Sequence, residues 1–258
     1  MNSRRLASVL LVAATVALGT LDAADDPRAI MTQVQKRTQA QSQQYEGVLK
    51  VTDAAGKSSE KGWVYQRTGS NGASKVVIRF TLPAEVKGIA LLVVNYPNRS
   101  SDQWMWTPAI SRERRIAAQD RSARFFGTDF SFEDLEERDV EQFDYRLQKD
   151  EVIAKEPCWK IVATPKAGMR SQYTSSTYWV RKSNYSYAQI ENSNAKGLVR
   201  RLKYSQMANV QGIWTAGTLE VEDVARKSRT VLSLRSIKYN TVLPADLFTV
   251  QALRRAGK

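Results

Sequence analysis

The sequence predicts a mainly β protein of the α+β class, in which one antiparallel sheet curves strongly and helices lie against its hollow side. Two observations carry this prediction. From Glu46 onward, short runs of alternating apolar and polar residues follow one another, joined by turns rich in Gly, Asn and Ser. No Pro/Ser-rich linker or shift in composition divides the chain, so we expect a single domain.

The first 24 residues are typical of a secretory signal peptide. Arg4 and Arg5 precede a charge-free apolar run at residues 6–18, which is short for a membrane span. Residues 17–19 fit the small-x-small cleavage pattern, whereas the pattern at 22–24 begins with an acid, so we expect cleavage between about residues 18 and 24. The folded domain then covers residues 25–258. An N-terminal anchor that is never cut is the alternative.

The numbers of cysteine and histidine residues indicate in which cellular compartment the protein lies and which catalytic mechanisms it can use. Cys158 is the only cysteine, so an intramolecular disulfide is impossible, and an exported protein without disulfides fits a Gram-negative-type periplasm. There is no histidine, which excludes Ser-His-Asp and Cys-His catalysis and histidine-ligated metals. A carboxylate pair or a Ser-Lys dyad would remain possible, but neither can be located. We therefore expect no enzyme activity, no metal and no cofactor.

The net charge of +13 is strongly positive, and 42% apolar with 25% charged residues is typical of a soluble globular domain. Outside the cytoplasm, a positive field favours transient contact with anionic membrane surfaces over binding to nucleic acid, for which no motif is present. A solvated basic surface that aids solubility is the alternative.

A helix is expected over residues 28–44. Asp26 can cap it, Pro27 suits the first turn, and Ile30, Met31 and Val34 lie at helical spacing. This apolar stripe is thin, so the helix should pack by one narrow face.

The period-two runs predict ten or eleven strands. Their apolar positions are Leu49 and Val51; Trp63 and Tyr65; Val76, Ile78 and Phe80; 89–94; Trp104 and Trp106; Trp159, Ile161 and Ala163; Tyr178 and Val180; 198–204; Leu219 and Val221; Leu232 and Leu234. Residues 243–248 then predict a capped turn that returns Leu247 and Phe248 to the body. So many strands with one apolar face must close into a barrel, form a sandwich or curl around helices. The N-terminal helix and residues 110–140 can serve as plugs, which favours an open, curved sheet.

The stretch FFGTDFSFEDL at residues 125–135 places four phenylalanines among acidic and hydroxyl side chains. Two charged sets, about fifteen positions apart, could form an ion-pair latch that fixes this segment, with Asp129 also capping a short turn that runs to Leu135. The sets are Arg112, Arg114 and Arg115, and Asp129, Glu133 and Asp134. A solvated arginine cluster is the alternative. We favour structural pairing of the carboxylates over catalysis, because no nucleophile accompanies them.

Four motifs carry a resemblance to a known family. Residues 88–92, 102–104 with Pro108, 114–116 and 126–135 resemble the LolA-like outer-membrane lipoprotein-sorting proteins, in particular the branch found beside RND/MMPL-type exporters. The C-terminal Leu-Pro-x-x-Leu-Phe agrees, although Trp106 and Thr128 stand where relatives often have tyrosine and serine. The resemblance implies an unclosed β-barrel of about eleven antiparallel strands, with helices over a hydrophobic cavity.

The resemblance also implies non-covalent carriage of a lipid or an acylated lipoprotein through the periplasm. Candidate lining residues of the cavity are Trp63, Tyr65, Ile78, Phe80, Leu91, Val93, Trp104, Trp106, Phe125 and Phe130, although plain core packing is the alternative for each. Trp104 and Trp106 share one side of their strand, because side chains repeat every two residues. A sensor that restrains a membrane protein and a partner subunit of an inner-membrane exporter are the other hypotheses, and we expect a monomer.

Overall fold

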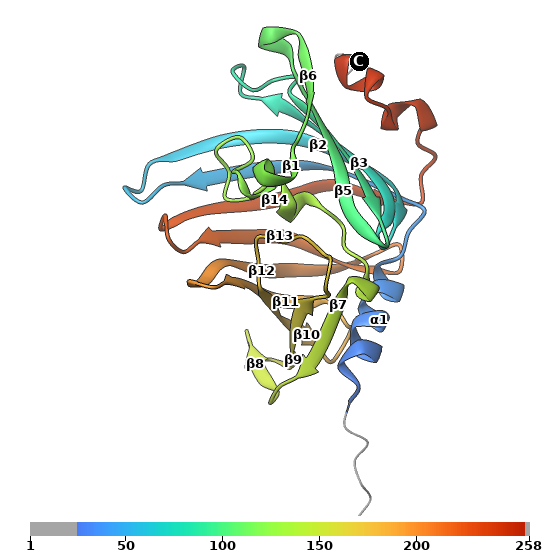
Figure 1. Ribbon diagram of the computed structural model, residues 1–258, viewed down its shortest axis with the longest axis vertical. Helices are drawn as coiled ribbons and strands as arrows, with labels where there is room; N and C mark the ends of the chain where they lie inside the picture. Colours follow the sequence, from blue (N-terminus) through green and yellow to red (C-terminus); the bar gives the residue numbers. More distant parts are fainter. Residues whose placement is uncertain (1–24, 256–258) are drawn as a thin grey trace, which may run out of the picture.

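The structure is a computed structural model that describes residues 25–255. Within this part of the chain, fourteen strands form one sheet in the order β6-β5-β4-β3-β2-β1-β14-β13-β12-β11-β10-β9-β7, with β8 paired to β9 (Figure 1). The strands are β1 (Ser42–Thr52), β2 (Ser58–Ser70), β3 (Ala73–Leu82), β4 (Ala90–Tyr96), β5 (Arg99–Thr107), β6 (Arg112–Arg115), β7 (Phe143–Leu147), β8 (Glu151–Ile153), β9 (Glu156–Pro165), β10 (Ser175–Arg181), β11 (Tyr187–Asn194), β12 (Gly197–Val210), β13 (Ile213–Asp223) and β14 (Ser228–Tyr239).

The first and last strands lie side by side in the middle of the sheet. β1 pairs antiparallel with both β2 and β14, and the sheet extends from this centre in both directions through antiparallel neighbours. Its two edges, β6 and β7, do not pair with each other, so the sheet is curled but unclosed. A register shift between Gln44 and Glu46 of β1, opposite Ser236 of β14 with its positive φ, adds the local twist that a bulge produces.

The number of strands differs from the sequence prediction of about eleven. The runs that were missed are β6, β7, β8 and β11. They are short or rich in charged and polar residues, as in Arg-Glu-Arg-Arg of β6 and Glu-Asn-Ser-Asn at the end of β11. Such strands are held by ladder hydrogen bonds to neighbours, and a local apolar pattern does not reveal them.

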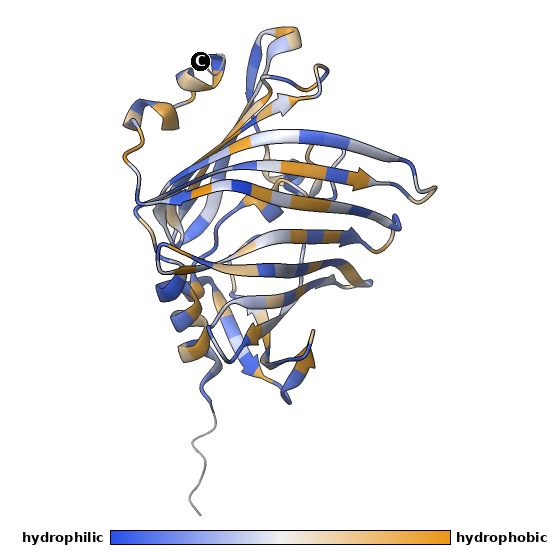
Figure 2. Cartoon of the chain, turned by 180° about the vertical axis from the view of Figure 1, so that it is seen from behind, coloured by the Kyte–Doolittle hydropathy of each residue, from blue (hydrophilic) through white to orange (hydrophobic). Residues whose placement is uncertain are grey.

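One face of the sheet, here called the hollow face, carries the main core. Alternate residues such as Leu49, Trp63, Ile78 and Leu91 point to it and are almost completely buried. Figure 2 shows the corresponding alternation of apolar and polar residues along the strands. Period-two patterning therefore predicted this face correctly for the central strands.

Helix α1 (Pro27–Thr38) lies on the hollow face near β9 and β10 (Figure 1). The Asp26 side chain accepts a hydrogen bond from the Arg28 amide, 3.0 Å away, and Ile30, Met31 and Val34 are buried, as the sequence predicted. The expected extension to residue 44 is wrong. The chain enters β1 at Ser42, because residues 42–52 gain ladder partners on both sides, and this pairing outweighs the helical tendency of the glutamines.

The C-terminal segment packs against the opposite, outer face of β3, β4 and β5. It contains two short 3₁₀ helices, η5 (Ala245–Phe248) and η6 (Gln251–Arg254), and Phe248 and Leu253 are buried against Val77 and Leu92. Arg79 donates to the Leu253 carbonyl over 3.1 Å and so fixes the end of this segment. The predicted return of residues 247–248 to the body is confirmed.

Candidate functional site

The central segment of the chain, residues 116–142, crosses the hollow face and is called the plug (Figure 1). Phe125, Phe130 and Phe132 are buried in the same core as Trp63 and Phe80. The ring of Phe125 stacks on Phe80 with centroids 5.3 Å apart and meets Phe132 edge-on at 5.5 Å. The phenylalanines therefore serve as apolar contacts that attach the plug to the sheet.

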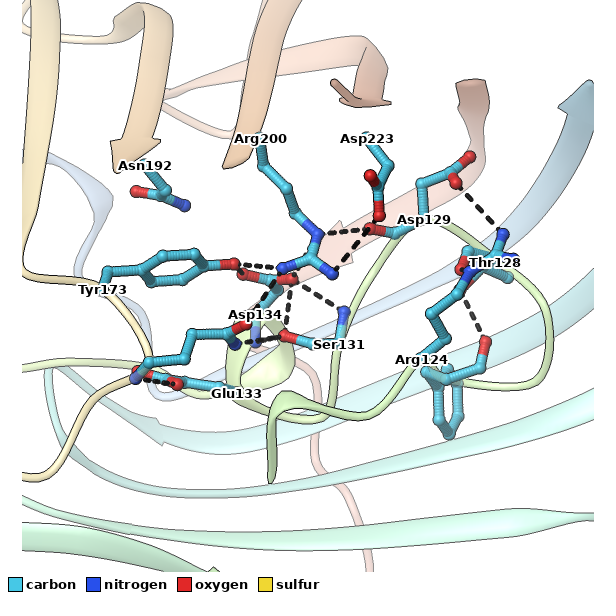
Figure 3. Close-up of polar contacts among 12 residues, drawn as sticks. Arg124, Thr128, Asp129, Ser131, Glu133, Asp134, Tyr173, Asn192, Arg200 and Asp223 are labelled. Atoms are coloured by element: carbon cyan, nitrogen blue, oxygen red, sulfur yellow. Dashed lines mark hydrogen bonds and ion pairs between the residues drawn. The ribbon is translucent and has the colours of Figure 1, made fainter. Parts of the chain in front are cut away.

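Buried polar contacts also attach the plug to strands β12 and β14 (Figure 3). Asp129 is fully buried, and its carboxylate accepts from Ser228 Oγ at 2.5 Å and Thr230 Oγ1 at 2.7 Å, both on β14. Arg124 of the plug lies 3.1 Å from the same carboxylate. Arg200 Nε on β12 donates to the Asp129 carbonyl over 2.7 Å. Asp129 thus connects the plug to two strands far away in the sequence.

Two further carboxylates hold the plug. Asp134 accepts from the Tyr173 hydroxyl at 2.7 Å and lies 3.4 Å from Arg200 Nε. Glu133 pairs with Arg138 and accepts from the Gln172 amide at 2.9 Å. All three predicted latch carboxylates therefore have structural partners, consistent with pairing over catalysis.

The predicted partners of these carboxylates are wrong. Arg112, Arg114 and Arg115 lie on the edge strand β6, whose pairing with β5 directs them away from the plug anchors. Arg115 pairs with Asp102 and Arg114 lies 3.6 Å from Asp120. Asp129 does not cap the turn that reaches Leu135 either, because its carboxylate is already engaged with β14.

Two adjoining cavities lie beside the plug, between α1 and the hollow face. The first, of about 300 Å³, is called the polar cavity because plug residues 133–139 form much of its wall, together with α1, β10 and β11. The second, of about 290 Å³, is called the apolar cavity because Ile213, Leu219, Leu232 and Leu234 line it. Val34, Thr38, Glu137, Tyr187 and Tyr204 line both, so the two cavities meet.

Five tyrosines form the most distinctive part of this lining and are called the tyrosine wall. They are Tyr45 on β1, Tyr65 on β2, Tyr178 on β10, Tyr187 on β11 and Tyr204 on β12. The rings of Tyr45 and Tyr65 stack with centroids 4.5 Å apart, and those of Tyr178 and Tyr187 lie tilted against each other with centroids 5.4 Å apart. Burial raises the pKa of all five hydroxyls, so they stay protonated at physiological pH.

The charges in the lining are largely paired. Arg67, with 5% of its side chain exposed, donates to Glu137 at 2.5 Å, and Glu137 also accepts from Ser74 at 2.5 Å. Burial raises the pKa of Glu136, whose carboxylate is paired with Arg121. Neighbouring ion pairs of this kind leave little net charge on the walls.

The structure divides the ten predicted lining residues into three groups. Tyr65 lines the apolar cavity. Trp63, Ile78, Phe80, Leu91, Val93, Phe125 and Phe130 lie in the core between plug and sheet. The expectation that Trp104 and Trp106 face the hollow side is wrong. They pair across from Leu92 and Ala90 on the outer face, where the C-terminal segment packs over them.

Most of the residues around the cavities were missed in the sequence. Tyr45, Tyr187 and Tyr204 are not among the predicted lining, although Tyr45 and Tyr204 follow the period-two spacing of Leu49 and Leu202 on their strands. A count of tyrosines at inward positions of successive strands would have revealed the wall. The part of the hollow face that the plug covers depends on contacts between residues far apart in the sequence. The part that remains uncovered and lines the cavities was therefore not predictable.

None of the helices in residues 25–255 has the length and hydrophobicity needed to cross a membrane. In the same part of the chain, no group of three acidic or cysteine side chains is arranged as a metal site. The predicted signal peptide lies outside the described residues.

The described chain is thus an unclosed, curled antiparallel sheet with one α-helix and two adjoining cavities on its hollow face. A family model with the description "Uncharacterized protein" matches residues 72–255, more than half of the chain. The chain belongs to the family that this model describes, and its fold is LolA-like. No curated protein sequence gives a significant match.

Solved structures share the fold over nearly the whole described chain. A domain from Vibrio parahaemolyticus, described as an outer membrane lipoprotein-sorting protein domain, has a TM-score of 0.84 at 23% identity, covering 89% of this chain and 98% of that one. A DUF1329 family protein from Desulfovibrio piger has a TM-score of 0.84 at 28% identity, with 88% and 99% covered. A LolA superfamily protein from Nitrosomonas europaea has a TM-score of 0.67 at 19% identity, with 88% and 98% covered.

Proposed function

We propose that the protein is a periplasmic carrier that binds a lipid or an acylated lipoprotein non-covalently in the two joined cavities. It would move this cargo toward the outer membrane, or to or from an inner-membrane exporter. The observation that carries the proposal is the pair of cavities between α1 and the hollow face, lined by aliphatic and aromatic side chains.

The size and lining of the cavities fit such a ligand. Each volume lies at the lower end of the range of about 300–1,000 Å³ that is typical of small-molecule sites. Burial of an acyl chain contributes about 0.8 kcal/mol per methylene group, so a chain of ordinary length could be held firmly without a covalent bond. Beside the plug, whose phenylalanines pack against the sheet, the two joined cavities would provide the space for such a chain.

The cover of the cavities is suited to opening. Helix α1 contributes Met31, Val34, Gln35 and Thr38 to the lining, and it is attached through the narrow apolar face that contains Ile30, Met31 and Val34. A small displacement of one helix would expose both cavities, while the plug stays attached through its own buried contacts.

Native mass spectrometry of the mature protein, purified gently from its host, tests the proposal. We expect a stoichiometric lipid or acylated peptide to co-purify, and the emptied protein to bind a fluorescent fatty-acyl probe. A protein that is empty on purification and also fails to bind the probe would rule out carriage.

A matched pair of variants assigns the probe to the cavities. Leu219→Arg places a long cation in the apolar cavity and should abolish probe binding. Leu82→Arg makes the same change where the leucine is 41% exposed, and should leave binding intact. Far-UV circular dichroism confirms that both variants are folded. Equal probe binding by the two variants would place the ligand elsewhere.

A further inference from the structure

The polar groups around the joined cavities are more numerous than a bare hydrocarbon ligand requires. Tyr239 and Tyr173 use their hydroxyls in hydrogen bonds to Thr215 and Asp134. By contrast, among residues 25–255 the hydroxyls of Tyr65, Tyr187 and Tyr204 have no hydrogen-bond partner, and they are not enclosed by protein atoms. A hydrocarbon chain that displaced water from these hydroxyls would leave them unpaired, which is unfavourable.

Arg67 has unused hydrogen-bonding capacity as well. Its Nη1 donates to Glu137 and Ser70, whereas its buried Nε has no partner within the described part of the chain. Arg67 lines the apolar cavity, and Glu137 lines both cavities. Because this Nε is enclosed by protein atoms, the donors that a ligand can reach where the two cavities meet are the hydroxyls of Tyr187 and Tyr204.

The two cavities differ in character on either side of this junction. On one side, the leucines of β13 and β14 offer a wall without polar atoms. On the other, plug residues 133–139 contribute five carboxylates and one arginine, while Asn71, Ser176 and Asn192 add neutral polar groups. A ligand matched to both would be apolar at one end and would carry polar groups at the other, where apolar side chains such as Met31, Ile190 and Leu202 also line the wall.

The charged side chains that line the cavities indicate which kind of polar head group the ligand carries. The cations that line the cavities, Arg67 and Arg138, are paired with Glu137 and Glu133. Asp139 caps the short helix η4 (Val140–Gln142) through the Glu141 amide at 2.8 Å and has no cationic partner among the described residues. An anionic head would find no free cation and one additional carboxylate, whereas neutral hydroxyl and carbonyl groups would match the available donors and acceptors.

We infer that the cargo is a neutral, single-chain lipid whose oxygen-rich head lies in the polar cavity and whose tail lies in the apolar cavity. Tyr187 and Tyr204, which line both cavities, hydrogen-bond the head where it joins the tail. This inference rests on the proposed function and specifies the class of lipid carried.

Three probes with the same chain length test the inference: 1-monopalmitoylglycerol, palmitate and hexadecane. Each displaces a fluorescent acyl probe from the emptied mature protein. We expect 1-monopalmitoylglycerol to bind at least about tenfold more tightly than either of the others, the difference that one or two good hydrogen bonds produce. Tighter or equal binding of palmitate or hexadecane would overturn the inference and leave carriage intact. If none of the three binds, the proposed function falls together with it.

The double variant Tyr187→Phe/Tyr204→Phe keeps both rings and removes only the hydroxyls. It should weaken 1-monopalmitoylglycerol about tenfold and tighten the binding of hexadecane, because no hydroxyl is then left unpaired beside the hydrocarbon. Tyr96→Phe is the matched control, since Tyr96 lies outside both cavities, against Arg99. An equal loss for all three probes in the double variant, or no loss for 1-monopalmitoylglycerol, would overturn the assignment. Urea unfolding confirms that the variants remain folded.

Discussion

Replacement of Asp129 is expected to detach the plug from the sheet. The side chain is fully buried, and its two carboxylate oxygens accept from Ser228 and Thr230 on β14 while Arg124 supplies the positive charge. Asp129→Ala removes the acceptor of all three groups at once. Ser228 Oγ then loses its carboxylate partner in a buried position, Thr230 keeps only the hydrogen bond from the residue-129 amide, and Arg124 loses its ion pair while it still donates to the carbonyls of Gly127 and Thr128.

The magnitude follows from these contacts. Removal of one member of a buried ion pair costs about 3–5 kcal/mol, and we expect Asp129→Ala to lower the free energy of unfolding by that amount. Asp129→Asn keeps the shape and one acceptor oxygen, and the Ser228 or Thr230 hydroxyl can rotate to accept from the new amide. Its expected cost is about 1–3 kcal/mol, chiefly from the loss of charge beside Arg124.

Urea unfolding followed by circular dichroism measures both changes as a lower midpoint at constant slope. Asp144→Ala and Asp144→Asn are the controls, because Asp144 is exposed on β7 and substitutions of this kind usually change stability by less than about 0.5 kcal/mol. Midpoints for the Asp129 variants that match those of the controls would refute the anchoring role. A larger cost for Asn than for Ala would refute the account given for the carboxylate.

Three other predictions concern the same core and wall. Phe125→Ala should cost about 3–5 kcal/mol in urea unfolding, because it removes a ring that stacks between the plug and Phe80; a cost below about 1 kcal/mol would contradict that packing. Gly47→Ala should cost about 1–3 kcal/mol, since a Cβ there would lie 2.2 Å from Trp63 Nε1; unchanged stability would show that the indole can move aside. The raised pKa of the tyrosine wall means that above pH of about 10 the unfolded chain loses phenolic protons that the folded chain keeps, so the free energy of unfolding should fall as pH rises. Phenolate absorbance from the wall should therefore appear at a higher pH in the folded protein than in the urea-unfolded protein, and equal titration midpoints would contradict the raised pKa.

The fold was largely predictable because period-two alternation is a local property. It located the inward positions of β2, β3 and β4, for example Trp63, Ile78 and Leu91, and the structure buries them on the hollow face. The outer position of Trp104 and Trp106 was not predictable in this way. Alternation says which residues share a face, but not which face is hollow. Both faces of the apolar strand β4 are covered in the structure, and the C-terminal segment provides the second cover.

The ion pairs show the same limit. Proximity in sequence suggested that Arg114 or Arg115 would hold Asp134, yet Arg200, from a strand much further along the chain, lies 3.4 Å from it. The sheet brings β12 beside the plug through the pairing order of its strands, which local sequence does not contain. The sequence therefore predicted that Asp129, Glu133 and Asp134 form structural pairs, because they lie among apolar residues. Their actual partners could be identified only from the order in which the strands pair.

The division of the hollow face follows the chemistry of its aromatic residues. Where the plug packs, the rings are mainly phenylalanine, which has no polar atom to satisfy, and the contact can exclude water completely. Under α1, the corresponding rings are tyrosine, whose hydroxyls need a partner, and the plug provides none for Tyr65, Tyr187 and Tyr204 among the described residues. A surface of this kind is poorly suited to permanent closure by an apolar protein segment. It remains compatible with water when the cavities are empty and with a polar ligand when they are filled, which is the behaviour that a reversible carrier requires.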